Sequence, residues 1–138
     1  MNPSLLKALE DRHLVSVMNL TKWKELCAAV STLPFPPAFQ RKNVRCDIPH
    51  PEPFEEDAWY YCDWNEGLLS PEEIEWIRVR PRRVVKCGRL IPSKTEDITE
   101  LFLSALAKHS ISLERDGEAI IIYGHVRNTN RILNENGA

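Results

Sequence analysis

Apolar residues recur at helical spacing in two stretches near the N-terminus. The first predicts a short helix over 3–14, because Pro3 is acceptable at a first helical position and the apolar residues after it keep a helical period. The second predicts a helix that starts after a capping side chain, Asn19 or Thr21, and ends near Ser31. We expect the apolar stripe of this second helix to be buried. The stripe consists of Trp23, Leu26, Cys27 and Val30.

A third helix is expected in the C-terminal half of the chain. Ser93 and Glu96 match the S-x-x-E pattern of a capping box, in which two side chains satisfy free backbone N–H groups of the first turn. The helix should run to Lys108 or His109, because cations are favourable at a helix C-terminus. Its predicted apolar stripe consists of Ile98, Leu101, Phe102, Ala105, Leu106 and His109.

The remaining apolar segments favour strands. Aromatic enrichment predicts a strand over 59–64, and 73–79 should return as its antiparallel partner across a Gly-containing loop. A turn around Gly117 predicts a hairpin of 111–114 and 119–126, the second of which should be the most buried strand. A further strand is expected over 42–47.

Three prolines in the segment 33–39 end the second helix, because proline and the residue before it disfavour helical geometry. We interpret this segment as a rigid arm that lays Phe35 and Phe39 on the core. The alternative is a polyproline ligand for an aromatic groove on another protein.

This order of elements predicts an α+β fold, with a single antiparallel sheet and two N-terminal helices and one later helix packed on it. The length of 138 residues suits one domain, expected over 1–126 with a polar tail at 127–138. With 43% hydrophobic and 28% charged residues, the composition is that of a globular chain. No apolar run reaches the roughly 20 residues of a membrane helix, and the N-terminus does not resemble an export signal. A cytoplasmic location is therefore expected.

Charge divides the middle of the chain into an acidic and a basic segment. Residues 47–75 contain ten acids and no Lys or Arg, whereas residues 76–94 contain seven bases and no acid. The basic segment could bind phosphates, but the neighbouring acids would repel a polyanion if the two segments pair. The alternative is that the acidic and basic edges neutralise each other across a sheet. The acidic segment, with its aromatic residues and prolines, suits a surface that captures a basic protein.

The sequence contains little that indicates catalysis or metal binding. The four cysteines include no C-x-x-C pair and favour reduced thiols over a zinc site or disulfides. His50 beside Asp47 or Glu52 is the nearest approach to an acid–base pair, and we interpret it as a solvated loop residue rather than the centre of a small hydrolase. Phosphate-binding glycine motifs and the G-x-S-x-G motif are absent from the sequence. The prediction is therefore a protein that is not an enzyme and has no metal or cofactor.

Four motifs together resemble a family of small bacterial proteins classified as a domain of unknown function. They are MNLTKWKEL at 18–26, LPFPPAFQRK at 33–42, DAWYY at 57–61 with IEWIRV at 74–79, and IIIYGHV at 120–126. The resemblance covers most of the chain and implies a related fold, but it implies no activity that can be assigned to residues. The Arg-rich segment 81–94 departs from the family pattern. Proteins of this type are often neighbours of polymorphic toxins, so the resemblance suggests an immunity protein by association.

The expected function is therefore that of an immunity protein, which neutralises a bacterial toxin or another basic protein by direct occlusion. The residues expected to bind this partner are Glu52, Phe54, Glu55, Glu56, Asp57, Asp63, Trp64, Glu66, Glu72 and Glu73. Acidic groups in this set would steer a cationic partner, and the aromatic ones would anchor it. The alternative is a nucleic-acid-associated regulator, for which the binding residues would be Arg80, Arg82, Arg83, Lys86 and Arg89.

Overall fold

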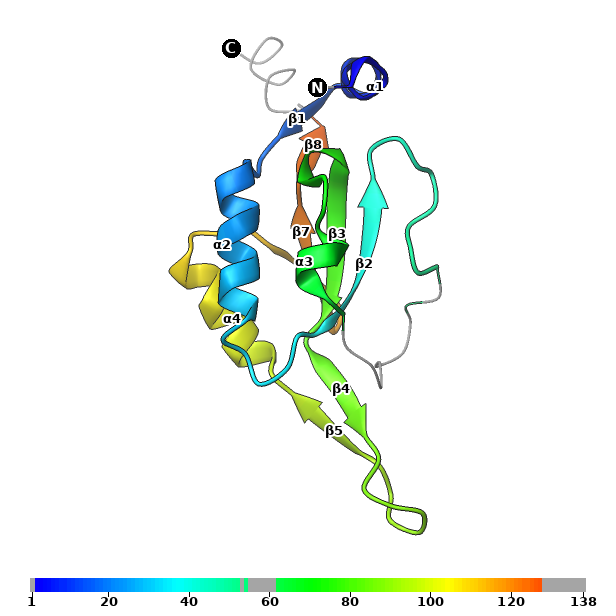
Figure 1. Cartoon of the computed structure of the whole chain (residues 1–138), viewed down its shortest axis with the longest axis vertical. Coiled ribbons are helices and arrows are strands. Elements are labelled where there is room, and N and C mark those ends of the chain that lie inside the picture. The colour runs from blue at the N-terminus through cyan, green and yellow to red at the C-terminus, as the bar shows by residue number, and fades with distance from the viewer. Residues whose placement is uncertain (1, 53, 55–61, 128–138) are drawn as a thin grey trace.

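The computed structural model describes residues 2–52, 54 and 62–127 and shows an α+β fold (Figure 1). The described helices are α1 (Pro3–Asp11), α2 (Leu20–Val30), α3 (Trp64–Gly67) and α4 (Thr99–Lys108), with a 3-10 helix, η1 (Pro71–Glu73). The described strands are β1 (Leu14–Ser16), β2 (Ala38–Asn43), β3 (Ile74–Arg80), β4 (Arg82–Val85), β5 (Lys94–Asp97), β6 (Glu114–Asp116), β7 (Ala119–Tyr123) and β8 (His125–Arg127).

Three antiparallel sheets replace the single sheet that was predicted. The central sheet has the strand order β2-β3-β7-β6, and β1–β8 and β4–β5 form two separate pairs. Proline cannot donate to a strand ladder, so Pro81 ends the central sheet and the chain after it pairs with itself in β4–β5. The run 119–126 is interrupted at Gly124, where a Cβ atom would lie 2.3 Å from the backbone oxygen of Ile74. Beyond this close approach the chain leaves β7 and pairs with β1.

The core lies between one face of the central sheet and the helices α2 and α4 (Figure 1). Its largest contributions come from Trp23, Leu26, Val30, Phe102, Leu106, Ile77, Val79, Ile120 and Ile122. The predicted stripe of α2 is thereby confirmed at three of its four positions, and Cys27 is half-buried. In α4, Leu101 is 52% exposed, which corrects its predicted place in the stripe. The helix α1 lies beside β1, at the end of the molecule opposite β4–β5, so only one of the two N-terminal helices packs on the central sheet.

Two predicted strands are corrected at their boundaries or type. Of the strand expected over 42–47, only Lys42 and Asn43 are in a strand, because β2 ends at Asn43 and the chain turns after it. The strand starts at Ala38, within the proline-rich segment, where Phe35 and Phe39 are buried as the rigid-arm interpretation predicted. Of the strand expected over 59–64, residues 59–61 lie outside the described residues, Cys62 and Asp63 are not in a strand, and Trp64 begins α3. The Asp63 carboxylate accepts hydrogen bonds from the first backbone N–H groups of α3, and this local cap favours a helix over the strand that aromatic residues suggest. The pairing partners of β3 are β2 and β7.

The capping box predicted at Ser93 is wrong. Ser93 is exposed, and Glu96 belongs to β5, where its carboxylate pairs with Arg83 of β4 at 3.0 Å. The helix begins at Thr99, whose backbone N–H donates to the Asp97 carboxylate at 2.8 Å. The hairpin after α4 is confirmed, but its first strand is β6 and its turn includes Gly117 at a positive φ of 59°.

Acidic and basic residues of the two charged segments form ion pairs with residues outside both segments. Glu75 of the acidic segment pairs with Arg12 and Lys42, and Glu73 pairs with Arg45. In the basic segment, the partners are Asp116 for Arg78, Glu118 for Arg82 and Glu96 for Arg83. These ion pairs of both segments are therefore formed with other parts of the chain rather than between the two segments.

Candidate binding groove

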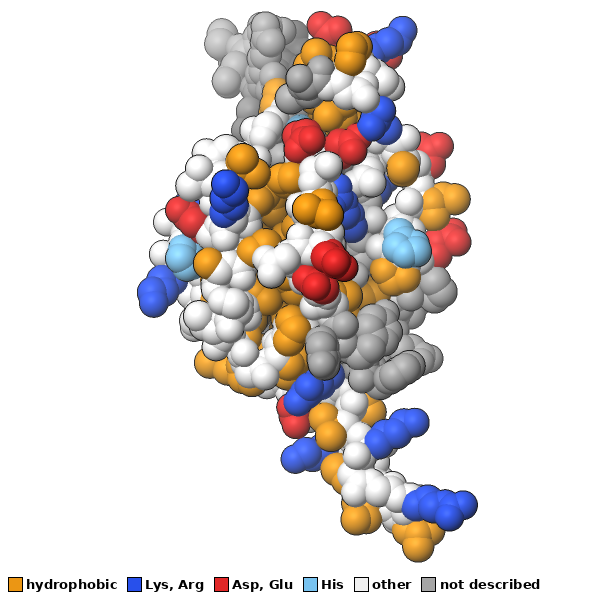
Figure 2. Space-filling view, viewed as in Figure 1, with side chains coloured by type: hydrophobic (Ala, Val, Ile, Leu, Met, Phe, Trp, Pro, Cys, Tyr) orange, Lys and Arg blue, Asp and Glu red, His pale blue; other side chains and the backbone are white. Residues whose placement is uncertain are grey.

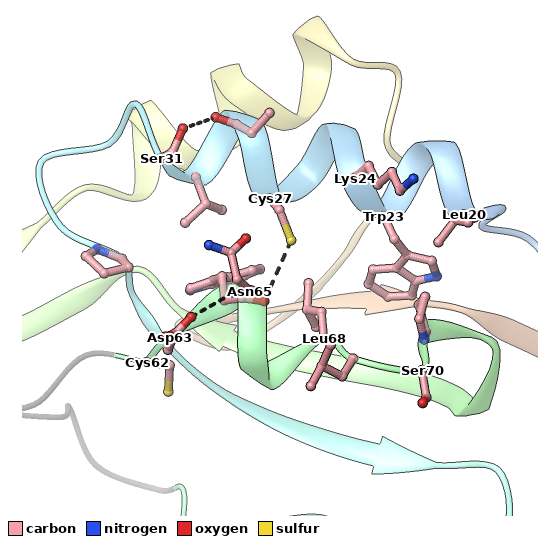
Figure 3. Close-up of a pocket in the computed structure, with 16 residues that line it drawn as sticks. Leu20, Trp23, Lys24, Cys27, Ser31, Cys62, Asp63, Asn65, Leu68 and Ser70 are labelled. Carbon is pink, nitrogen blue, oxygen red and sulfur yellow. Dashed lines mark hydrogen bonds between the residues drawn. The ribbon is translucent and has the colours of Figure 1, made fainter.

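A groove of about 890 Å³ runs between α2 and the segment α3–η1, here called the α2–α3 groove (Figure 3). Trp23, Lys24 and Cys27 contribute from α2, and Leu68 and Leu69 contribute from the end of α3 and the turn after it. Most of the lining is apolar. Leu20 and Leu69 stand at its rim with 55% and 66% of their surface exposed. An exposed apolar pair beside a groove is a feature of surfaces that bind a partner.

The wall formed by α3 is fixed to the core through Trp64. The indole Nε1–H of Trp64 donates to the backbone oxygen of Pro37 at 2.9 Å. Its ring packs against Phe39 at a centroid distance of 4.6 Å and against Phe102 at 6.3 Å. Asp63 caps the helix with acceptor contacts of 2.9 and 3.1 Å to the N–H groups of Asn65 and Glu66. A helix of only four residues is thus held by packing and a cap rather than by its own length.

Arg41 of β2 fixes the end of the same wall. Its guanidinium donates to the backbone oxygens of Gly67, Leu69 and Ser70 at 3.0, 2.6 and 3.1 Å. These contacts satisfy carbonyls at the C-terminal end of α3, which have no partner inside the helix. Burial lowers the pKa of Arg41, although the charge of Glu73 opposes the shift. The guanidinium stays charged, because an arginine is not deprotonated in proteins.

The α3–η1 segment that forms one wall of the groove is acidic. Asp63 lines the groove and is exposed. On the same segment Glu66 and Glu72 are exposed, and Glu73 is half-buried and paired with Arg45. The facing helix α2 contributes the exposed Lys24. Figure 2 shows acidic side chains beside apolar surface in the middle of the molecule, where α3 lies in Figure 1. A cationic group on a partner would meet these acids, and the exposed leucines line the same groove.

The structure brings together four of the predicted partner-binding residues: Asp63, Glu66, Glu72 and Glu73. Glu52 is exposed on the separate loop that follows β2. Phe54 and Trp64 are wrong as surface anchors, because they are 3% and 4% exposed. Phe54 packs in a second apolar cluster with Ala38, and Trp64 belongs to the main core. The remaining residues of that set, Glu55, Glu56 and Asp57, lie outside the described residues.

Leu20 and Leu69 are the rim residues that the sequence analysis missed. Leu20 lies three positions before Trp23 and continues the stripe of α2 outward, and Leu69 is the second apolar residue in the polar stretch NEGLLSP. An apolar residue in a polar loop is a weak signal, because single exposed leucines are common on protein surfaces. The structure makes Leu69 relevant because Leu69 and Leu20 both line one groove.

The predicted nucleic-acid-binding arginines do not form one surface. Arg80 is 6% exposed, and its Nε donates to the backbone oxygen of Phe54 at 2.9 Å. Arg82 pairs with Glu118, and Arg83 pairs with Glu96 and lies over the ring of Phe35 at 4.4 Å. These three arginines therefore make contacts within the chain, and a role in nucleic-acid binding stays a prediction. Lys86 and Arg89 are exposed beyond β4.

The thiols and histidines show two kinds of environment. All four cysteines are free; Cys46 and Cys87 are exposed, and Cys27 and Cys62 are half-buried. Burial raises the pKa of Cys27 and of Cys62, the latter against a hydrogen bond to the backbone oxygen of Phe39. His50 is exposed, and its backbone pairs with Arg41. Among the described residues, no three His, Cys, Asp or Glu side chains come close enough to hold a metal ion.

The fold and the groove define a small α+β domain with an apolar groove that has an acidic wall. The chain belongs to DUF6678, a family of unknown function, whose model matches residues 5–129. The matched span contains all four motifs on which the resemblance to such a family rested. Comparison with curated proteins and with solved structures gives no significant match. Within the described residues, no helix combines the length and apolar character that a membrane crossing requires.

Proposed function

We propose that this chain is a non-enzymatic binding protein whose α2–α3 groove takes an amphipathic, cationic segment of another protein. The observation that carries the proposal is that the exposed Leu20 and Leu69 line one groove together with the exposed Asp63. Glu66 and Glu72 add exposed acids on the α3–η1 segment that forms one wall of this groove. Apolar anchors in a groove provide most of the binding free energy of such interfaces, and a charged rim raises the association rate. An amphipathic helix with leucines on one face and Lys or Arg beside them would match this arrangement.

The finer form of the proposal is an immunity protein that acts in the cytoplasm. In this form the partner is a bacterial toxin whose cationic surface is covered by the acidic α3–η1 segment, so that stoichiometric binding blocks its action. Two features support it: the exposed acids Asp63, Glu66 and Glu72 lie on the α3–η1 segment, and this segment forms one wall of an apolar groove. Occlusion requires no reacting group on this chain, because the bound protein itself covers the partner's surface.

Co-expression with the product of the adjacent gene tests the proposal. We expect the two chains to co-purify at equal stoichiometry and this chain to restore growth if the neighbour is toxic. The rim variants Leu20→Asp and Leu69→Asp should each weaken the complex by about tenfold or more, which is the loss of a good anchor residue.

Ile48→Asp and Leu101→Asp are matched controls, because these residues are exposed apolar side chains outside the α2–α3 groove. Both control variants should bind the partner as tightly as the wild-type chain. If the product of the adjacent gene neither binds this chain nor is neutralised by it, the immunity proposal is wrong. A complex that tolerates both rim substitutions but not the controls would show that binding occurs on another surface.

A further inference from the structure

The pair β4–β5 forms an arm that projects from the body of the molecule (Figure 1). Residues 86–93 connect the two strands at its far end. The connection carries Leu90, 97% exposed, and Ile91, 60% exposed, followed by Pro92. Leu90 is the most exposed of the large apolar side chains described, so the arm presents an aliphatic tip to its surroundings.

The base of the arm is held to the body by charge and packing. Arg83 pairs with Glu96 across the two strands and lies over the ring of Phe35 at 4.4 Å. Arg82 pairs with Glu118, which lies in the turn between β6 and β7. The backbone N–H of Ile98 donates to Pro81 at 2.8 Å and closes the base. These contacts use the cations nearest the body and set the direction of the arm.

The cations further along the arm have a different environment. Lys86, Arg89 and Lys94 are exposed, and none of them pairs with an acid among the described residues. No Asp or Glu occurs from Val84 to Thr95. Figure 2 shows basic and apolar side chains along the arm. The arm therefore combines three cations, spread over both of its sides and its tip, with an aliphatic pair at its end.

We propose that this arm binds duplex DNA, with Lys86, Arg89 and Lys94 on the phosphates and Leu90–Ile91 as a wedge against the base steps of the minor groove. Proteins that read DNA with β-ribbons place strands in the major or the minor groove, and proteins that bind the minor groove often insert Leu, Ile or Pro between base steps. Single-stranded nucleic acid is instead held by stacking on aromatic rings, and residues 82–97 contain none. The site is independent of the α2–α3 groove and takes a different class of ligand.

An anionic membrane is the competing partner for a basic arm with an aliphatic tip. Stable membrane binding takes two strong signals, such as a lipid chain with a polybasic patch, and the arm offers three cations and two short side chains. The cations also lie along both sides of the ribbon, which suits phosphates on the two edges of a groove better than a flat surface below the tip. We therefore favour DNA, and the membrane becomes an outcome of the test.

Fluorescence anisotropy with a labelled DNA duplex tests the proposal on the full chain. Three phosphate contacts predict that log K falls with log salt at a slope of about −2.7, or about 40-fold between 50 and 200 mM salt. The triple variant Lys86→Gln, Arg89→Gln, Lys94→Gln should lose this binding. The matched control Lys7→Gln, Lys108→Gln, Arg115→Gln removes the same three charges from exposed positions elsewhere and should retain it.

The wedge has its own readout. A duplex labelled at both ends should bend on binding the wild-type chain, and Leu90→Ser with Ile91→Ser should abolish the bend while the salt slope stays the same. Three outcomes would overturn the proposal. They are no binding to the duplex at low salt, an equal loss of binding in the arm triple variant and the control triple variant, and equally tight binding of single-stranded DNA. Sedimentation with phosphatidylserine vesicles but no retention of the duplex would assign the arm to a membrane surface instead.

Discussion

At Glu75, burial and neighbouring charges act in opposite directions on the pKa. Its carboxylate accepts hydrogen bonds from Arg12 at 2.7 and 3.0 Å and from Lys42 at 2.6 Å. Burial by itself would raise the pKa of Glu75, but the hydrogen bonds and charges of Arg12 and Lys42 outweigh it and hold the pKa below its usual value of 4.5. Arg12 also donates to the backbone oxygen of Val44 at 2.9 Å, so this cluster ties the segment after α1 to the central sheet.

Replacing Glu75 by Gln should lower the free energy of unfolding by about 1–2 kcal/mol at pH 7, because two charged hydrogen-bond donors lose their anion. A carboxylate whose pKa is lowered by folding stabilises the protein above its unfolded pKa, and the effect is lost as the pH falls through the folded pKa. The gap between wild type and Glu75→Gln should therefore be full above about pH 4.5 and shrink below it.

Urea unfolding between pH 3 and 7 measures this gap. Glu10→Gln serves as the control, because Glu10 is exposed and forms no ion pair with a described residue. A gap that stays constant through the acid range would contradict the assignment of the stabilisation to the Glu75 charge.

At the scale of the element, the start of α4 shows a case in which tertiary contacts override a local sequence pattern. Ser93 and Glu96 have the spacing of a capping box, yet Glu96 forms a cross-strand pair with Arg83 and the sequence around it becomes β5. The N-cap residue of α4 is Ile98, which makes no side-chain cap, and the Asp97 carboxylate before it accepts from the backbone N–H of Thr99. Hydrogen bonding to Thr99 lowers the pKa of Asp97 against the opposing effect of burial.

Substituting Asp97 by Ala should destabilise the protein by about 1 kcal/mol, because the backbone N–H of Thr99 loses its hydrogen bond to the carboxylate. Ser93→Ala should leave stability nearly unchanged, because Ser93 is exposed in the arm and caps no helix. Thermal unfolding of the two variants compares them directly. A larger loss for Ser93→Ala than for Asp97→Ala would restore the capping box and shift the start of α4.

Elements with a long, regular apolar period were predictable from the sequence, and those decided by distant contacts were not. Local spacing predicted the stripe of α2 and left Asn19 or Thr21 as its cap; three of the four stripe residues are buried, and Asn19 is the cap. The helix α3 has four residues and depends on Asp63, Trp64 and the distant Arg41. A strand prediction there followed from residue preference, which is weaker than tertiary packing over so short a segment.

At the scale of the whole molecule, the α+β class could be predicted, but the division into three sheets could not. The division depends on Pro81 and on the close approach at Gly124, and only the fold shows which backbone lies opposite the glycine. The candidate site also has features that the sequence predicts and features that only the fold shows. The acids of α3–η1 were visible as a charged segment, whereas the exposure of Leu69 and the burial of Trp64 depend on how α3 is placed on the core.

The central claim is that the α2–α3 groove is the surface that binds a protein partner. Cys27 lines this groove, whereas Cys87 is exposed in the distant arm (Figure 3). Their rates of alkylation by iodoacetamide can be followed by mass spectrometry in the free chain and in its complex with the adjacent-gene product. Burial raises the pKa of Cys27, so a reaction at mildly alkaline pH gives a measurable rate.

The account predicts that complex formation slows alkylation of Cys27 by at least about tenfold, an effect equivalent to roughly 1.4 kcal/mol, and leaves Cys87 unchanged. Cys87 provides an internal control for the reagent within the same sample. A complex in which Cys27 reacts as fast as in the free chain would contradict the account, because the groove would then be open while the partner is bound.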